Sequence, residues 1–241
     1  MNRILFEKGE IADGVATCGG VRARHILEVL HGEVGQTLKT GEVGGRIGTG
    51  VICAIRGESA APVVDVRVDH SSDGPAPWAD VVLAPPRPRV MKRLLPQMAA
   101  MGVGRIVLVG AKKVEKDFWG ATLLKEENWR PLFVEGLMQA GTSAMPELLV
   151  RRSFRKFLAD ELDATFPTAN RVVAHPYRDG AGPAPVRAGR LLLAIGPEGG
   201  WTDDEVGLLE SRGFRRQSLG PRILRTDTAT VALLSKLNTE Q

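Results

Sequence analysis

The sequence predicts a two-domain protein in which a small β-rich domain precedes an α/β domain with a mainly parallel sheet. Short apolar runs separated by glycines and charged turns fill the first seventy residues. Farther along, apolar runs alternate with helical periodicity, as in βαβ units. A cluster of Ser, Gly and Pro between the two parts is typical of a linker. The 241 residues suffice for two cores, so we place domains at 1–70 and 81–241, with the linker at 71–80.

The first domain is predicted to be a small barrel. One short helix is expected at residues 23–32, because Ile26, Leu27 and Leu30 lie at helical spacing. Several short strands with Gly-rich turns are typical of a closed or partly closed sheet. The strands are expected at residues 3–6, 36–40, 46–55 and 62–68.

The second domain is predicted to alternate strands and helices. A helix is expected at residues 89–102, with Gly102 as its C-cap and Pro96 kinking or splitting it. A second helix is expected at residues 126–141. Strands are expected at residues 81–85, 105–110, 171–175 and 191–195, and a further short strand is expected to end at Leu219. Thr226 or Asp227 is expected to cap a strongly apolar final helix.

The loop Gly-Pro-Glu-Gly-Gly at residues 196–200 connects a predicted strand to a predicted helix. Thr202 and Glu205 form the T-x-x-E pattern of a capping box, so the helix begins near residue 202. In α/β sheets, ligands bind beyond the carboxyl ends of the strands. The first turn of this helix is acidic, which disfavours a phosphate there and suits a neutral or positively charged ligand.

A second loop, at residues 218–225, is also unusual. It places Ile223 and Leu224 between Arg222 and Arg225. An apolar slot for a flat ring with basic groups at its rim would use all four side chains. The alternative is that Ile223 and Leu224 belong to the core and the arginines are solvated.

The formal net charge is +4, and the basic residues are clustered. Residues 1–70 carry eight Lys/Arg and nine Asp/Glu, whereas residues 87–116 carry eight basic residues and one acidic residue. Residues 212–225 carry five arginines and no acid. Such clusters can bind a polyanion, or they can be a solvated face without a partner.

Several functional classes are disfavoured by composition. Two cysteines do not make a disulfide framework, and four histidines without an H-x-x-x-H pair do not indicate a zinc site. No apolar run has the length of a membrane span, and the first residues lack the apolar region of a secretory signal. We therefore expect no metal, no membrane association and a cytoplasmic location.

Together, IGPEGGWTDDEV and LGPRILRTDTA strongly resemble the bacterial 16S rRNA (uracil-N3)-methyltransferase family of the SPOUT superfamily. RPRVMKRLLPQMAAMGVGRIVLVGA resembles the first helix–strand unit of that family. RHILEVL and the Gly-rich segment after it resemble its PUA-like RNA-binding domain. The resemblance covers nearly the whole chain.

The resemblance implies an α/β domain with a C-terminal trefoil knot, preceded by a PUA-like β-barrel domain. It implies a homodimer that methylates N3 of a uridine in the 16S rRNA of the small ribosomal subunit. The cofactor would be S-adenosyl-L-methionine, whose sulfonium suits the acidic helix start and whose adenine suits the apolar slot. It would be bound by three loops, with the contacts Ala174, His175, Ile195, Gly196, Pro197, Gly199, Gly200, Ser218, Leu219, Gly220, Ile223 and Leu224.

The resemblance also implies roles for charged residues. We expect Arg225 to stabilise the anionic base or to hold its phosphate. Glu198 is either the proton acceptor or an organiser of its own loop. The candidate RNA contacts, chiefly to phosphates, are Arg3, Arg22, Arg24, Arg46, Arg87, Lys92 and Arg93.

One segment departs from the family pattern. Met138 and Thr142 stand where many members carry Glu and Arg, so base recognition differs here if that Arg places the target base. Three alternatives stay open: another SPOUT methylation (of a ribose 2′-hydroxyl or a tRNA base), a ribosome-associated RNA-binding protein without catalysis, and a small-molecule methyltransferase.

Overall fold

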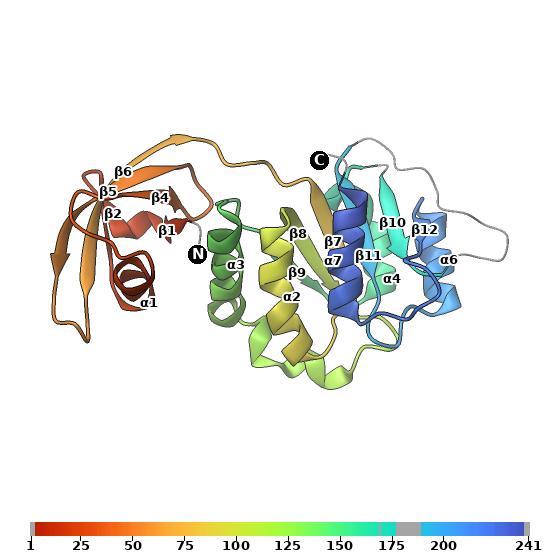
Figure 1. Ribbon diagram of the computed structural model, residues 1–241. Coiled ribbons are helices and arrows are strands. Elements are labelled where there is room, and N and C mark those ends of the chain that lie inside the picture. Colours follow the sequence, from red (N-terminus) through yellow and green to blue (C-terminus); the bar gives the residue numbers. More distant parts are fainter. Residues whose placement is uncertain (1–2, 169, 177–188, 239–241) are drawn as a thin grey trace. The chain divides into compact units, whose positions relative to one another are not determined.

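A computed structural model describes residues 3–168, 170–176 and 189–238 (Figure 1). The chain divides into two compact units. The first consists of Met1–Ala76 and Val134–Met145, and the second consists of Pro77–Phe133 and Pro146–Gln241. The predicted domain limits of 1–70, 71–80 and 81–241 stay predictions, and the inclusion of residues 134–145 in the first unit has no signal in the sequence.

The first unit contains a curled, mixed, six-stranded sheet of order β1-β4-β5-β6-β3-β2. β1 pairs with β4 in parallel and the other neighbours are antiparallel. The four predicted strands are present, and two short strands that the sequence did not indicate complete the sheet. The strands are β1 (Ile4–Phe6), β2 (Ile11–Ala12), β3 (Val15–Cys18), β4 (Thr37–Glu42), β5 (Ile47–Arg56) and β6 (Val63–Ser72).

The predicted helix of the first unit is present but irregular. It starts as α1 (Gly20–Arg24) and continues as a π-helical turn, η2 (His25–Val29). Ile26 is fully buried, as its helical spacing predicted. A short 3-10 turn, η1 (Lys8–Glu10), precedes β2.

Arg3 joins residues 134–145 to the sheet of the first unit. Its backbone N–H donates to the carbonyl of Met138 at 3.1 Å, and its Nε donates to that of Gly141 at 2.9 Å. Its Nη1 donates to the carbonyls of Thr40 and Gly48. Three carbonyls therefore accept hydrogen bonds from one guanidinium, which fixes this segment in place.

The second unit contains a six-stranded sheet that is parallel throughout, of order β12-β10-β11-β7-β8-β9. This confirms the predicted α/β class with a parallel sheet. Strand β9 was not predicted. The strands are β7 (Ala79–Leu83), β8 (Val103–Val109), β9 (Glu147–Arg151), β10 (Arg171–Ala174), β11 (Leu191–Ile195) and β12 (Arg215–Gln217).

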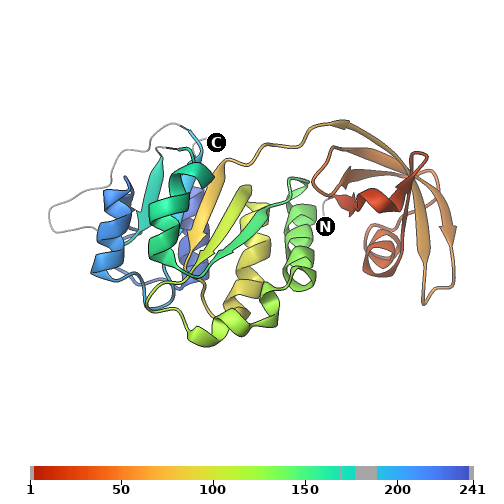
Figure 2. The same ribbon diagram turned by 180° about the vertical axis from the view of Figure 1, so that it is seen from behind.

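Helices cover both faces of this sheet, with α2 and α7 on one face and α4 and α6 on the other (Figures 1 and 2). α2 packs against α7. The face under α4 and α6 holds an aromatic-rich core that includes Phe154, Phe157, Phe166 and Trp201. The α-helices are α2 (Pro88–Ala100), α3 (Glu126–Ala140), α4 (Phe154–Lys156), α5 (Leu162–Thr165), α6 (Asp203–Ser211) and α7 (Thr226–Leu237). Of α3, the residues up to Phe133 belong to the second unit and those from Val134 belong to the first.

Shorter turns complete the second unit, and some predicted bounds need correction. A π-helical turn, η5 (Phe157–Glu161), joins α4 to α5, and the 3-10 turns η3 (Lys116–Gly120) and η4 (Thr122–Leu124) precede α3. Pro96 does not split α2, which runs unbroken to Ala100. Gly102 follows the helix with φ +79°, as its predicted C-cap role requires.

Candidate functional site

The Gly-Pro-Glu-Gly-Gly loop lies at the carboxyl end of β11, as predicted, and closes in a tight turn. The N–H of Gly200 donates to the carbonyl of Pro197 at 2.8 Å, and Gly200 has φ +67°. A Cβ on Gly196 would lie 2.9 Å from the backbone nitrogen of Trp201, so this position admits only glycine without a shift of the loop. Trp201 then anchors the end of the loop, because its buried ring stacks on Phe154.

Neighbouring loops hold this turn from two sides. The Glu198 carboxylate accepts a hydrogen bond from the backbone N–H of Arg87 at 2.9 Å, from the connection between β7 and α2. The Lys113 ammonium donates to the carbonyl of Gly199 at 2.7 Å, from the connection after β8. The loop is therefore fixed by contacts to the ends of two adjacent strands.

The predicted capping box at the start of α6 is present. The Thr202 hydroxyl accepts from the N–H of Glu205, and the Glu205 carboxylate accepts from the N–H of Thr202 at 2.9 Å. The same buried carboxylate also accepts from the backbone N–H of Lys112 at 2.7 Å. Glu205 thus caps α6 and ties it to the loop after β8.

A cavity of about 210 Å³ lies at the carboxyl ends of β10 and β12. Part of its wall comes from Ala229 and Leu233 of α7. The backbone N–H of His175 donates to the carbonyl of Gln217 at 3.2 Å, so the loops after β10 and β12 lie side by side. Gly220 has φ +103°, which is the left-handed conformation that favours glycine at the turn.

Many of the predicted cofactor contacts line this cavity, and others do not. Neither the loop at residues 195–200 nor the acidic first turn of α6 contributes to its walls. The predicted contacts that line it are Ala174, His175, Ser218, Leu219, Gly220, Ile223 and Leu224. Those that lie outside it are Ile195, Gly196, Pro197, Gly199 and Gly200.

The sequence left open whether Ile223 and Leu224 are core residues. The structure excludes that alternative, because Ile223 is 98% exposed and Leu224 is 38% exposed. Both side chains belong to the wall or rim of the cavity. The end of this loop differs slightly from expectation, since Arg225 is the N-cap of α7 and Thr226 and Asp227 are already helical.

His175 lines the cavity, and the pKa of its imidazole is shifted. Burial lowers the pKa of its imidazole below the ordinary value of 6.5, and the charge of Arg216 lowers it further. The imidazole is therefore neutral at pH 7. A neutral ring in the wall is compatible with a positively charged ligand in the cavity.

The predicted RNA contacts in the first unit divide into two groups. Arg3 is occupied by backbone carbonyls, and Arg22 is held by Glu10 and by the carbonyl of Leu5. Arg24 and Arg46 are exposed. RNA binding by all four stays a prediction, and exposure makes Arg24 and Arg46 the more accessible pair.

In the second unit the predicted RNA contacts lie around α2. Arg87 pairs with Glu115 at 2.9 Å, and Arg93 pairs with Asp227 at 2.8 Å, which links α2 to the first turn of α7. Lys92 is exposed on the same helix. Arg225, the predicted catalytic residue, is also exposed and does not line the cavity.

Met138 and Thr142, the two departures from the family pattern, are both buried in the first unit. Across residues 3–168, 170–176 and 189–238, there is no group of three His, Cys, Asp or Glu side chains that could hold a metal ion. Within the same ranges, none of the helices is long and apolar enough to span a membrane.

Residues 74–238 match the family model of the RNA methyltransferase domain. Together with the parallel sheet and the cavity at its carboxyl edge, this match identifies the class of protein as the RNA methyltransferases. Over 238 residues the chain is 31% identical to the ribosomal RNA small subunit methyltransferase E of Treponema pallidum, and the match covers 96% of this chain and 88% of that protein. The protein therefore belongs to the ribosomal RNA small subunit methyltransferase E family.

Solved structures share the fold over the whole chain. A Legionella pneumophila protein described as a methyltransferase, solved with bound S-adenosylmethionine, has a TM-score of 0.74 at 25% identity and covers 98% of this chain and 96% of its own. The ribosomal RNA small subunit methyltransferase E of Neisseria gonorrhoeae, solved with S-adenosylmethionine, has a TM-score of 0.71 at 20% identity, covering 99% and 97%.

Proposed function

We propose that this protein transfers a methyl group from S-adenosylmethionine to N3 of a uridine in the 16S rRNA of the small ribosomal subunit. One observation carries the proposal. In a chain of this methyltransferase family, the loops after β10 and β12, to which the resemblance assigns the cofactor, line one cavity at the carboxyl edge of a parallel sheet.

The walls of the cavity suit the adenosine part of the cofactor. Leu219, Ile223, Leu224 and Leu233 provide an apolar surface for a flat ring, and neutral His175 adds no charge that would oppose a sulfonium. The cofactor supplies the methyl group to be transferred. The volume of the cavity, about 210 Å³, is below the roughly 300–1,000 Å³ typical of ligand pockets. This small volume is consistent with a site in which one wall is supplied by another chain.

The protein has to orient the donor and the base, expose N3, and stabilise the charge that develops on the base as the N3 proton leaves. N3 is hidden in a base pair, so the target uridine is unpaired or flipped out of its helix. Exposed Arg225, which follows the cavity loop directly, is our candidate for charge stabilisation. The bond from Glu198 to the N–H of Arg87 supports a role for Glu198 in organising the loop.

A second copy of the chain would supply the missing wall. Exposure of a large aliphatic side chain such as Ile223 forfeits about 1.5–3 kcal/mol of burial energy, so this rim suits an interface. We therefore include a homodimer in the proposal. Ile223→Asp should shift the protein towards the monomer in light scattering coupled to size exclusion.

The proposal also includes a trefoil knot and RNA binding by a PUA-like first domain. The knot rests on the family resemblance; in the sheet, β12 pairs with β10 and not with β11, so the chain crosses over β11 before it reaches α7. The connection from β10 to β11 lies outside the described residues. A cytoplasmic location follows from a ribosomal RNA substrate.

Calorimetric titration with S-adenosylmethionine tests the cofactor site. Ala229 on α7 lines the cavity, whereas the adjacent Thr228 is exposed and does not. Ala229→Phe should abolish binding and Thr228→Phe should preserve it; equal binding by both variants would contradict the site. Gly196→Trp is a poorer test, because its Cβ alone would displace the loop.

Mapping the product on small-subunit rRNA tests the reaction. N3-methyluridine in the nuclease digest would support the proposal. A ribose methyl group, which blocks alkaline cleavage beside it, or a methylated tRNA base would indicate another SPOUT reaction. Cofactor binding without methylation of any of these RNAs would contradict the proposed activity.

A further inference from the structure

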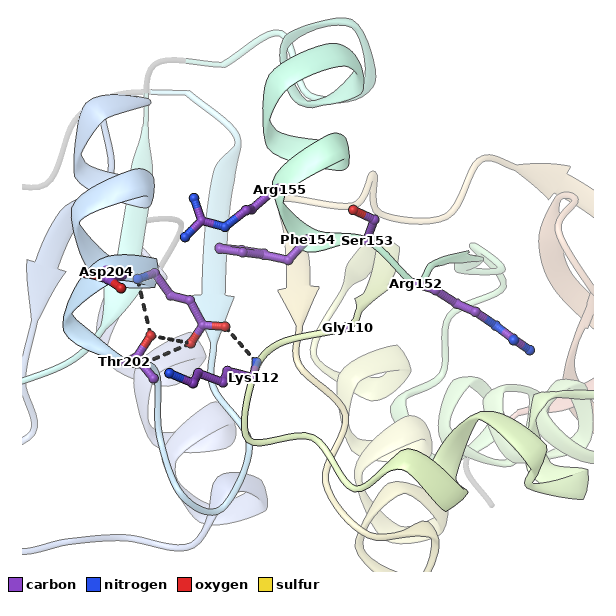
Figure 3. Close-up of a pocket in the computed structure, with 9 residues that line it drawn as sticks. Gly110, Lys112, Arg152, Ser153, Phe154, Arg155, Thr202 and Asp204 are labelled. Carbon is purple, nitrogen blue, oxygen red and sulfur yellow. Dashed lines mark hydrogen bonds between the residues drawn. The ribbon is translucent and has the colours of Figure 1, made fainter.

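A second hollow, of about 420 Å³, lies at the carboxyl ends of β8 and β9, on the side of the sheet covered by α4 and α6 (Figure 3). Its walls are the loop after β8, the start of α4 and the first turn of α6. None of the cofactor loops at residues 174–176, 195–200 and 218–225 contributes to it. The hollow is therefore separate from the cavity at the ends of β10 and β12.

Two acidic residues line this hollow, and they differ in availability. The buried carboxylate of Glu205 accepts three hydrogen bonds, from the N–H of Lys112 and from the N–H and hydroxyl of Thr202. Its negative charge is thereby compensated by fixed donors. The carboxylate of Asp204 is exposed, and among the described residues it has no hydrogen-bond partner or ion pair.

Two basic side chains line the hollow from different elements, Lys112 from the loop after β8 and Arg155 from α4. Arg155 extends beside the ring of Phe154 towards the α6 side, Lys112 extends towards the same side near Thr202, and Arg152 extends the other way (Figure 3). Within the described ranges neither the Lys112 ammonium nor the Arg155 guanidinium has a hydrogen-bond or ion-pair partner. The acidic first turn of α6 disfavours a phosphate when taken alone, as the sequence indicated. In the hollow, however, two available cations oppose one available carboxylate, which favours an anionic ligand.

We propose that this hollow binds a phosphodiester of single-stranded RNA next to the nucleotide that is methylated. The inference rests on the proposed function. A guanidinium and an ammonium are the groups that proteins use for phosphate, the first as a planar fork and the second as a point charge. Contacts of this kind position an RNA without reading its sequence.

The location of the hollow fits a strand that crosses the carboxyl edge of the sheet. The cofactor cavity begins at β10 and the second hollow begins at β8, three strand spacings or about 14 Å away when measured along the sheet alone. The loop at residues 195–200, at the end of β11, lies between them in the strand order. A few nucleotides suffice to connect the two places.

Asp204 allows a test in which two kinds of substitution should change RNA affinity in opposite directions. Its carboxylate repels a phosphate that Lys112 and Arg155 attract. Removing the two cations should therefore weaken RNA binding, whereas Asp204→Asn should strengthen it. A role of these residues in folding alone would not produce opposite effects.

The experiment measures binding of a fluorescein-labelled, uridine-containing, single-stranded small-subunit rRNA fragment to the full-length protein between 50 and 200 mM salt. The double variant Lys112→Ala/Arg155→Ala should bind roughly tenfold more weakly, and the slope of log K against log salt should fall by about 0.7 for each phosphate that is no longer neutralised. Asp204→Asn should bind about two- to threefold more tightly. The matched control is Lys156→Ala, because Lys156 is exposed next to Arg155 and does not line the hollow.

Several outcomes separate this proposal from the proposed function. The double variant should bind S-adenosylmethionine like the wild type in calorimetry and should show a raised KM for RNA in methylation. If the wild type methylates rRNA and the double variant keeps the salt slope and KM of Lys156→Ala, the hollow is not an RNA site and the function stands. If the double variant loses the binding of inorganic phosphate that the wild type shows but keeps the wild-type KM for RNA, the hollow is a small-anion site, and this result would also overturn the proposal. A wild type that neither binds the fragment nor methylates rRNA would overturn both.

Discussion

The Glu198 carboxylate lies 2.9 Å from the backbone nitrogen of Arg87 and accepts its hydrogen bond. The bond joins the Gly-Pro-Glu-Gly-Gly loop to the residue that precedes α2, where Pro88 cannot donate a hydrogen bond. A glutamate between glycines is thus explained by the shape of the loop. Its carboxylate holds a turn that has little other support apart from Lys113 and Trp201.

Substitution of Glu198 distinguishes an organising role from proton transfer. Glu198→Ala should weaken S-adenosylmethionine binding by roughly fivefold, because a solvent-exposed charged hydrogen bond contributes about 1 kcal/mol. Glu198→Gln retains an acceptor and should keep most of the affinity and of kcat. A collapse of kcat in Glu198→Gln with unchanged cofactor binding would instead identify Glu198 as the proton acceptor.

Arg225→Ala should lower kcat by about 10²–10³-fold while cofactor binding stays within twofold of wild type, because a donor that acts on developing charge matters only in the transition state. Its side chain is exposed, so the variant should fold normally. Arg222→Ala is the matched control, since Arg222 lines the cavity and its loss should affect cofactor binding first. Near-normal turnover of Arg225→Ala would exclude the assigned role.

Cofactor binding should depend on pH through His175. Because burial lowers the pKa of this imidazole, the ring is neutral at pH 7 and becomes a cation only below that lowered pKa. A cation in the cavity wall opposes a sulfonium, so affinity should be constant from pH 7 to 8 and should fall on acidification, by up to about tenfold per pH unit. His175→Asn should remove this dependence in calorimetry, and parallel curves for the two proteins would contradict the prediction.

Local patterns predicted the parts of the site that depend on neighbouring residues. Thr202 and Glu205 lie three positions apart, and their capping box formed as expected because both partners belong to one helical turn. The sequence also indicated that Ile223 and Leu224 belong to one odd loop. Local patterns did not place this loop beside the one at His175, because that contact depends on the pairing of β10 with β12; only the family resemblance implied that both loops bind one cofactor.

The sequence did not predict the second hollow, for a similar reason. Lys112 and Arg155 are 43 positions apart and come together only because β8 pairs with β9. β9 (Glu147–Arg151) is short and half-buried, so it lacks a clear alternating pattern. Tertiary pairing, which local periodicity does not encode, therefore created the charge cluster.

The stability of the second unit should depend on Arg190 in a pH-sensitive way. Arg190 Nη2 lies 2.6 Å from the buried carboxylate of Asp80, and burial raises the pKa of that carboxyl despite the arginine. A raised carboxyl pKa means that the folded state binds the proton more tightly than the unfolded chain. The ionised group therefore disfavours folding above the folded-state pKa, and this penalty disappears as the pH falls through it.

Arg190→Met leaves Asp80 without its nearest cation and should lower the free energy of unfolding at pH 7 by about 2 kcal/mol, less than for a fully buried pair because Arg190 is half-exposed. In urea denaturation, the loss of unfolding free energy caused by Arg190→Met should shrink from pH 7 to pH 5. When the same substitution is made in the Asp80→Asn background, the loss relative to Asp80→Asn alone should not change with pH. A deficit in Arg190→Met that is equal at both pH values would show that the arginine contributes packing and not charge.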